Sequence, residues 1–180
     1  AGKNHRVDHV RVDQGRSFIN MLGIGWDAWI AVKANRLRWL NRISGFLRYL
    51  VAAVLSIHKA WPQGLRIQMG RTIIQGRFMV LAVSNGPQYG FGCTVAPMAR
   101  LDDGYLDVVL VPWTTLRAFA INCVRLFTQQ PLVGAQYHRT RALSIQALDG
   151  KPLAIHLDGE PGGSTPAQVT LRPRALNVLV

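Results

Sequence analysis

The sequence predicts an α+β fold that is mostly β: an antiparallel or mixed β-sandwich with helices attached. Segments that alternate apolar and polar residues outnumber segments with helical periodicity. The helical segments also fall in two blocks, an insertion near residues 27–60 and a second helix near 115–129. Because they do not alternate with single strands, a doubly wound parallel sheet is disfavoured.

The first part of the chain is predicted to form a hairpin followed by the helical insertion. Residues 7–12 and 17–24 alternate apolar and polar side chains around the turn Asp13-Gln14-Gly15, which is typical of two antiparallel strands. From 27 to 60, apolar residues recur at steps of three and four and are interrupted at Ser44-Gly45. This pattern predicts one broken helix or two short ones.

The middle of the chain contains three predicted strands and one long loop. Residues 65–69 and 76–83 form strands joined by a turn at Gly70-Arg71, and the second is apolar enough to be buried on both faces. The Gly- and Pro-rich segment 84–104 then leads into a strand at 105–111. Loops of this length usually have a function.

The last part of the chain is predicted to contain the second helix and four short strands. Thr114 or Thr115 can cap this helix, which continues to about Gln129. The strands are expected at 142–147, 153–157, 167–171 and 176–179.

Composition restricts the function classes. The 180 residues are 49% hydrophobic, which is enough for one sizeable core and excludes disorder as the main state. Lys and Arg outnumber Asp and Glu by 21 to 9, and the net charge of +12 attracts phosphates, nucleic acid and anionic lipids. The longest apolar stretch, 49–57, is too short to span a bilayer. Cys93 and Cys123 have no metal or redox spacing, which indicates a reducing compartment.

Two acidic turns are candidate functional sites. Asp102 and Asp103 precede a strand, where carboxylate and carbonyl oxygens can hold Mg²⁺ or Ca²⁺, although Asp-Gly also favours an ordinary turn. Asp158 and Glu160 follow a strand, where a carboxylate can act as a general base, but a solvated hairpin turn explains them equally well.

The segment 28–60 is rich in Lys, Arg and aromatic residues and has no acidic residue. Such a helix can lie on an anionic membrane or bind nucleic-acid phosphates. It can also pack its apolar side on the sheet and leave a solvated basic side.

Eight segments form an ordered pattern over almost the whole chain. They are Val7-Asp8, Phe18-Ile19-Asn20, Gly23 to Ala28, Ser84-Asn85, Gly90-Phe91-Gly92, Ala96 to Val108, Asp158-Gly159-Glu160 and Leu171 to Leu179. Together they resemble the C-terminal domain of the bacterial diacylglycerol-kinase-like lipid kinases, a family that also includes sphingosine and ceramide kinases. The block ending in Asp102-Asp103-Gly104 and the Asp-Gly-Glu turn are the most specific parts of the resemblance.

The resemblance implies that residues 1–180 are a single domain, the C-terminal domain of a two-domain lipid kinase of phospholipid metabolism. The Gly-Gly-Asp-Gly-Thr motif of the nucleotide-binding domain is absent from this chain, so this fragment alone is expected to be inactive. The implied reaction is transfer of the γ-phosphate of ATP to the hydroxyl of diacylglycerol or a similar membrane lipid. The alternative is a non-catalytic basic β-sandwich module that binds nucleic acid or an anionic membrane.

Carried over by position, Glu160 resembles the general base that takes the proton from the lipid hydroxyl. Asp158 and Gly159 resemble the part of that turn nearest the nucleotide. Asp8 resembles a family acid near the interdomain cleft and is also expected on the nucleotide side.

The implied metal site consists of Asp103 with the backbone carbonyls of Arg100 and Tyr105, and Mg²⁺ is the expected metal. Asp27 and Asn20 are expected on the side of the lipid substrate.

The resemblance also implies several partners. They are ATP, a diacylglycerol-like lipid and an anionic membrane surface, with a homodimer left open and no nucleic acid expected. No secretory signal opens the sequence, so the expected location is the cytoplasm, in peripheral association with the membrane.

Overall fold

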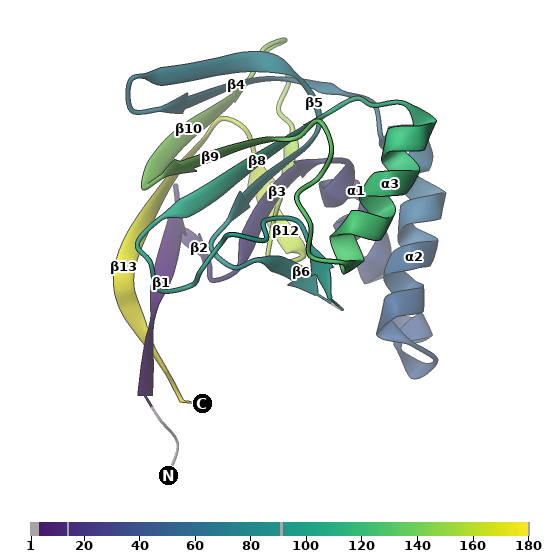
Figure 1. The fold of residues 1–180 in the computed structure, drawn as a ribbon, viewed down its shortest axis with the longest axis horizontal. Coiled ribbons are helices and arrows are strands. Elements are labelled where there is room, and N and C mark those ends of the chain that lie inside the picture. Colours follow the sequence, from purple (N-terminus) through teal and green to yellow (C-terminus); the bar gives the residue numbers. More distant parts are fainter. Residues whose placement is uncertain (1–3, 14, 91, 180) are drawn as a thin grey trace.

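The computed structural model describes residues 4–13, 15–90 and 92–179, and it confirms the mostly-β, α+β class (Figure 1). Gln14 of the predicted first turn and Phe91 of the glycine-rich segment lie outside the described residues. The strands are β1 (Asn4–Val12), β2 (Arg16–Phe18), β3 (Met21–Gly25), β4 (Gln63–Met69), β5 (Thr72–Ser84), β6 (Gln88–Gly90), β7 (Cys93–Thr94), β8 (Leu106–Pro112), β9 (Gln136–Thr140), β10 (Ala142–Ala147), β11 (Ala154–Leu157), β12 (Glu160–Ser164) and β13 (Ala167–Leu179). The helices are α1 (Trp26–Arg36), α2 (Gly45–Ser56) and α3 (Leu116–Phe127), with 3₁₀ turns η1 (Arg38–Arg42) and η2 (Ile57–Lys59).

One large sheet curves into a near-barrel. Its strands follow the order β12-β11-β3-β5-β4-β10-β13-β1-β2, while β8 pairs with β5 and β9 pairs with β8. Every pairing between strands in the described part of the chain is antiparallel. The strand β5 is the junction, because residues 72–78 pair with β4 whereas residues 80–84 lie between β3 and β8.

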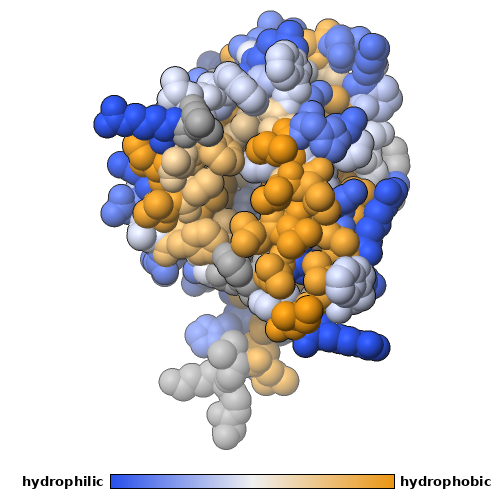
Figure 2. Space-filling model, turned by 90° about the vertical axis from the view of Figure 1, so that its right-hand side faces the viewer, coloured by the Kyte–Doolittle hydropathy of each residue, from blue (hydrophilic) through white to orange (hydrophobic). Residues whose placement is uncertain are grey.

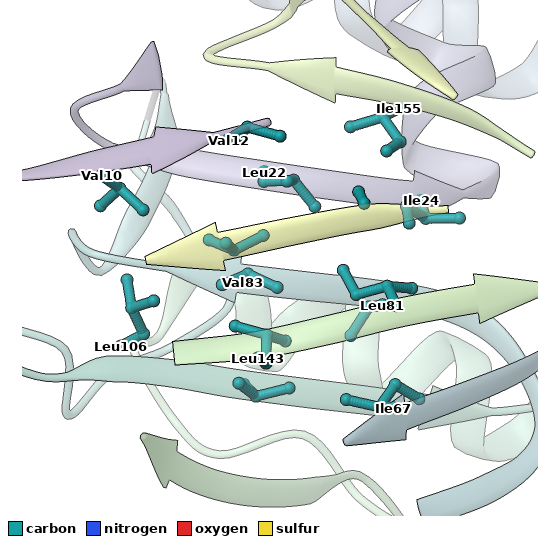
Figure 3. Close-up of a cluster of buried hydrophobic side chains, with 14 of the residues drawn as sticks. Val10, Val12, Leu22, Ile24, Ile67, Leu81, Val83, Leu106, Leu143 and Ile155 are labelled. Atoms are coloured by element: carbon teal, nitrogen blue, oxygen red, sulfur yellow. The ribbon is translucent and has the colours of Figure 1, made fainter. Parts of the chain in front are cut away.

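The interior of this sheet contains the main hydrophobic core (Figure 3). Alternate side chains of facing strands meet there, including Leu22, Ile67, Leu81, Leu106 and Ile145, which are all fully buried. On the outer side, Met79, Ala82 and Val109 form a second cluster, against which Trp26 and Phe119 from the helices pack. Residues of β5 therefore contribute to both clusters, as the sequence predicted for 76–83.

The helical insertion consists of two α-helices and two short 3₁₀ turns. Ser44 interrupts the insertion because its hydroxyl accepts a hydrogen bond from the backbone N–H of Leu47 at 3.4 Å and so caps α2. Thr115, one of two predicted caps, accepts the Ala118 N–H at 3.3 Å and begins α3. Among the described residues, no helix is long and apolar enough to span a bilayer.

Several predicted strand boundaries were wrong. The predicted strand 17–24 is two strands, β2 and β3, because Ile19 and Asn20 turn toward another segment. Conversely, 167–179 is one continuous strand that passes through Pro173. The strands β6, β7, β9 and β12 were not predicted, because they are short and rich in polar residues or glycine.

The two ends of the described chain lie side by side (Figure 1). The strands β1 and β13 pair from Asn4 opposite Leu179 to Val12 opposite Val169, and the register shifts between Val7 and His9.

We expect Ile67→Ala to lower the free energy of unfolding by about 2–5 kcal/mol, because Ile67 is fully buried in the main core. The matched change Ile73→Ala, at a residue that is 47% exposed at the tip of the same β4–β5 hairpin, should cost less than about 1 kcal/mol. Urea denaturation followed by circular dichroism measures both values. Equal losses would contradict the assignment of this core.

Candidate functional site

The turn between β11 and β12 carries the acidic residues Asp158 and Glu160. Asp158 and Gly159 both have positive φ values, 50° and 85°, and Leu157 pairs with Glu160 across the turn. This is the geometry of a two-residue hairpin with a primed turn, which favours Asp-Gly. The hairpin turn considered from the sequence is thus present, and it places Glu160 at the first position of β12.

The carboxylate of Asp158 is fully engaged with backbone N–H groups. It accepts hydrogen bonds from Ile19 at 2.9 Å, Asn20 at 3.0 Å and Met21 at 2.7 Å. In return, the Asp158 N–H donates to the Met21 carbonyl at 2.8 Å. Asp158 therefore joins the acidic turn to the β2–β3 connection.

Glu160, in contrast, points into solvent at the edge of the helical insertion. Its side chain is 61% exposed, and one oxygen lies 2.9 Å from the guanidinium of Arg38. The amide of Asn35 donates to the other oxygen at 3.3 Å and to the Gly159 carbonyl at 3.0 Å. Glu160 is thus an accessible carboxylate beside a cation, positioned by α1 and η1.

A buried polar network lies beneath this turn. Asp27 accepts the hydroxyl of Tyr89 at 2.6 Å, and the same oxygen lies 3.3 Å from Nε2 of His156. The Gly159 N–H donates to Nδ1 of His156 at 3.3 Å, which assigns the ring proton to Nε2, facing Asp27. Burial, followed by the charge of Asp27, raises the pKa of Tyr89 well above its usual value, so this hydroxyl stays a donor.

Gly23 in β3 leaves the room that this network needs. A Cβ at this position would lie 1.9 Å from Oδ2 of Asp27 and 2.2 Å from Nε2 of His156. The close packing of these two side chains thus requires glycine.

Asn20 and Asp8 tie loops together inside the domain. The Asn20 side chain donates to the Gln88 carbonyl at 2.6 Å, and the backbone carbonyl of Asn20 accepts the N–H groups of Asn85 and Gly86. Asp8 is fully buried at the register shift between β1 and β13.

The two oxygens of Asp8 bind distant backbone groups. They accept the N–H groups of Gly104 and Arg174, both at 2.7 Å. The side chain of Asn85 bridges the two regions, since it donates to the carbonyls of Asp8 and Ile19.

The predicted metal site contains a guanidinium beside its carboxylate. One oxygen of Asp103 accepts the Tyr105 N–H at 3.0 Å, and the other forms a hydrogen-bonded ion pair with Arg139 of β9. Arg139 also lies 3.6 Å from Asp107, whose pKa is raised by burial, and stacks over the Tyr105 ring at 4.7 Å. Arg100 pairs with Asp102 at 3.6 Å.

This arrangement does not fit a divalent cation unless Arg139 moves, because Arg139 already provides the positive charge at Asp103. The described residues also contain no group of three or more His, Cys, Asp and Glu side chains that could hold a metal. A metal at Arg100, Asp103 and Tyr105 stays a prediction, and we derive no chemistry through it.

The structure brings Glu160, Asp158, Gly159, Asn20 and Asp27 together around one turn, whereas Asp8 and Asp103 lie at the other acidic loop. Sequence reasoning missed the roles of Asn35, Arg38, Tyr89 and Arg139. Each contacts its acidic partner over more than 30 positions of sequence, a distance at which no local pattern signals the contact.

Comparisons with known proteins match almost the whole chain. Residues 20–180 match the family model described as the YegS C-terminal NAD kinase beta sandwich-like domain. A probable lipid kinase YegS-like of Xanthomonas oryzae pv. oryzae (strain MAFF 311018) is 27% identical over 176 residues, which cover 96% of this chain and 56% of the relative. The corresponding protein of Pseudomonas aeruginosa (strain UCBPP-PA14) is 30% identical over 166 residues, covering 91% and 53%.

Solved structures show the same fold. A putative diacylglycerol kinase from Bacillus anthracis str. Sterne superposes with a TM-score of 0.73 at 20% identity, over 97% of this chain and 57% of that one. The chain therefore spans about half the length of the relatives that it matches.

We expect Asp158→Asn to lower the free energy of unfolding by about 1–3 kcal/mol, because one amide oxygen cannot accept all three N–H groups. Asparagine tolerates the positive φ of this position, so the change tests the acceptor and not the backbone. Asp149→Asn is the control, since Asp149 also precedes a glycine and its carboxylate accepts a single N–H group, that of Lys151, among the described residues. Urea denaturation measures the free energy of unfolding of both variants. Equal losses in the two variants would contradict the anchoring role of Asp158.

Proposed function

Because this chain belongs to the YegS C-terminal NAD kinase beta sandwich-like domain family, we propose that it is the base-carrying, substrate-side domain of an ATP-dependent lipid kinase. The enzyme transfers the γ-phosphate of ATP, bound as its Mg²⁺ complex, to the hydroxyl of diacylglycerol or a similar membrane alcohol. The relatives named as lipid kinases support the kinase class.

The observation that carries the proposal is the exposed carboxylate of Glu160 on an anchored turn. Phosphoryl transfer needs a residue that orients the attacking hydroxyl and removes its proton. A carboxylate oxygen of Glu160 accepts this proton while the lipid oxygen bonds to the γ-phosphorus, and the bond from that phosphorus to ADP breaks. The guanidinium of Arg38, 2.9 Å from one oxygen, orients this carboxylate on the turn.

The other acids act in this proposal as positioning residues. The carboxylates of Asp158 and Asp8 are engaged with backbone N–H groups, which supports a role in shaping loops near the nucleotide. On the lipid side, Asp27 supports the same turn through His156, which accepts the Gly159 N–H. Asn20 supports it by donating its backbone N–H to Asp158. Rigid support of this kind keeps a base within reach of its substrate.

The remaining half of the active site lies outside this chain in the proposal. Because the sequence lacks the Gly-Gly-Asp-Gly-Thr nucleotide motif and spans about half of its relatives, we expect residues 1–180 alone to be inactive. The complete enzyme works in the cytoplasm, peripherally bound to an anionic membrane, and a homodimer stays a prediction.

We expect Glu160→Gln to reduce phosphoryl transfer by about 100-fold or more, because glutamine cannot accept the proton. The assay uses the full native gene product, including any part of it beyond residues 1–180. It follows the transfer of label from γ-labelled ATP into lipid that is extracted with organic solvent. Asp149→Asn removes the same charge in another Asp-Gly turn and should leave the rate unchanged.

Label that survives in Glu160→Gln would place the base elsewhere and keep the kinase. Absence of label from folded wild-type protein across a broad lipid extract would overturn the kinase proposal itself.

A further inference from the structure

The helical side of the molecule exposes large apolar side chains. Figure 2 views the molecule from this side and shows hydrophobic residues gathered over much of the face, with hydrophilic ones around its edge. Its principal members, here called the helical face, are Leu50, Val54 and Ile57 of α2 and η2 and Ile121 and Val124 of α3. Contiguous exposed apolar surface of this kind marks an interaction site.

The fully buried residues of the helix α2 are small, and several of its large apolar residues are exposed. Ala52 and Ser56 are buried, whereas Val54 is 63% exposed and Leu50 48%. A surface helix of a globular protein normally buries its larger apolar side chains. The orientation of α2 therefore indicates that its outer side has an apolar environment of its own.

Both helices are held in one layer by Trp26. Its indole N–H donates to the hydroxyl of Ser56 in α2 at 3.1 Å, and its ring packs on Phe119 of α3 with centroids 5.6 Å apart.

The segments next to the helices contribute exposed tryptophans. The rings of Trp61 and Trp113 contact each other in a tilted arrangement, with centroids 6.0 Å apart, and the two residues are 67% and 57% exposed. Tryptophan is enriched where protein meets the headgroup region of a bilayer.

The charge around this face selects an anionic partner. Residues 26–61 contain six Lys or Arg and residues 113–128 contain two, whereas Asp27 is the sole acidic residue in either segment. Asp27 is buried within its polar network and adds nothing to the surface. A nucleic acid would use the positive charge but not the exposed Leu, Val and Ile side chains. A membrane with anionic headgroups uses both.

The helical insertion, which bears part of the helical face, also reaches the candidate base. Arg38, which pairs with Glu160, precedes Trp39, whose side chain is 63% exposed. Further along the same insertion, Tyr49 of α2 approaches the turn, because a Cβ on Gly159 would lie 3.6 Å from its hydroxyl.

We propose that the helical face, together with Trp61 and Trp113, is the surface by which this domain docks on an anionic bilayer. In this position a lipid hydroxyl at the headgroup level is delivered beside Glu160, so the purpose of docking rests on the proposed function. The binding itself requires neither ATP nor phosphoryl transfer.

Sedimentation of the full native gene product with lipid vesicles tests this surface. Wild-type protein should bind vesicles of phosphatidylcholine with phosphatidylglycerol more strongly than phosphatidylcholine alone, and part of the binding should survive high salt. Val54→Glu with Val124→Glu should lower the partition coefficient by about tenfold or more, because two carboxylates then face the headgroups. Ile73→Glu, at an exposed residue of the β4–β5 hairpin, is the matched control and should bind like wild type.

Several results would overturn the docking surface. The first is wild-type protein that stays in the supernatant with vesicles of either composition. The second is a Val54→Glu/Val124→Glu variant that is folded by circular dichroism and binds vesicles as strongly as wild type. The third is a wild-type dimer in solution that the same two substitutions dissociate. Binding of RNA in place of vesicles would equally assign the face to another partner. Glu160→Gln should bind vesicles normally. Wild-type protein that binds vesicles but transfers no phosphate to any lipid would refute the kinase and leave the docking surface standing.

Discussion

The carboxylate of Asp158 is the interaction on which the site depends. By accepting three consecutive N–H groups from residues 19–21, it ends β2, begins β3 and fixes the β11–β12 turn against that connection. The same contact brings Asn20 beside the turn and places Glu160 where Asn35 and Arg38 reach it. The side chain of one residue, whose backbone is in the left-handed region, thus sets the position of elements that are more than 130 residues apart in sequence.

The acids of this basic chain fall into two kinds. Asp8, Asp27 and Asp158 direct their oxygens inward, to backbone N–H groups or to Tyr89 and His156. Glu160 alone among these four points to solvent, beside a guanidinium. Buried or engaged carboxylates give rigidity, while the exposed one remains available for chemistry. This division separates residues that shape the proposed active site from the one that would act on substrate.

Much of the fold follows from local patterns, whereas the site follows only in part. Alternation and the hydrophobicity of 76–83 predict the sheet and the doubly buried β5, and Ser44-Gly45 marks the break in the helical insertion. The strand β13 was predicted as two because Pro173 interrupts the pattern, but Asp8 holds the Arg174 N–H and carries the strand through. The Asp158-Gly159-Glu160 turn is evident in the sequence. Its partners Asn35 and Arg38 are not, because they lie 122 to 125 residues away.

The pairing of Asn4 with Leu179 has a consequence for how the domain can be handled in evolution or in the laboratory. A domain whose ends emerge next to each other can be inserted into a loop of another protein without stretching its host. It can also be circularly permuted, with a short linker across the old ends and new ends opened at the exposed Gly70-Arg71 turn. The sheet would keep every strand neighbour that it has now, so chain order and architecture are separable in this protein.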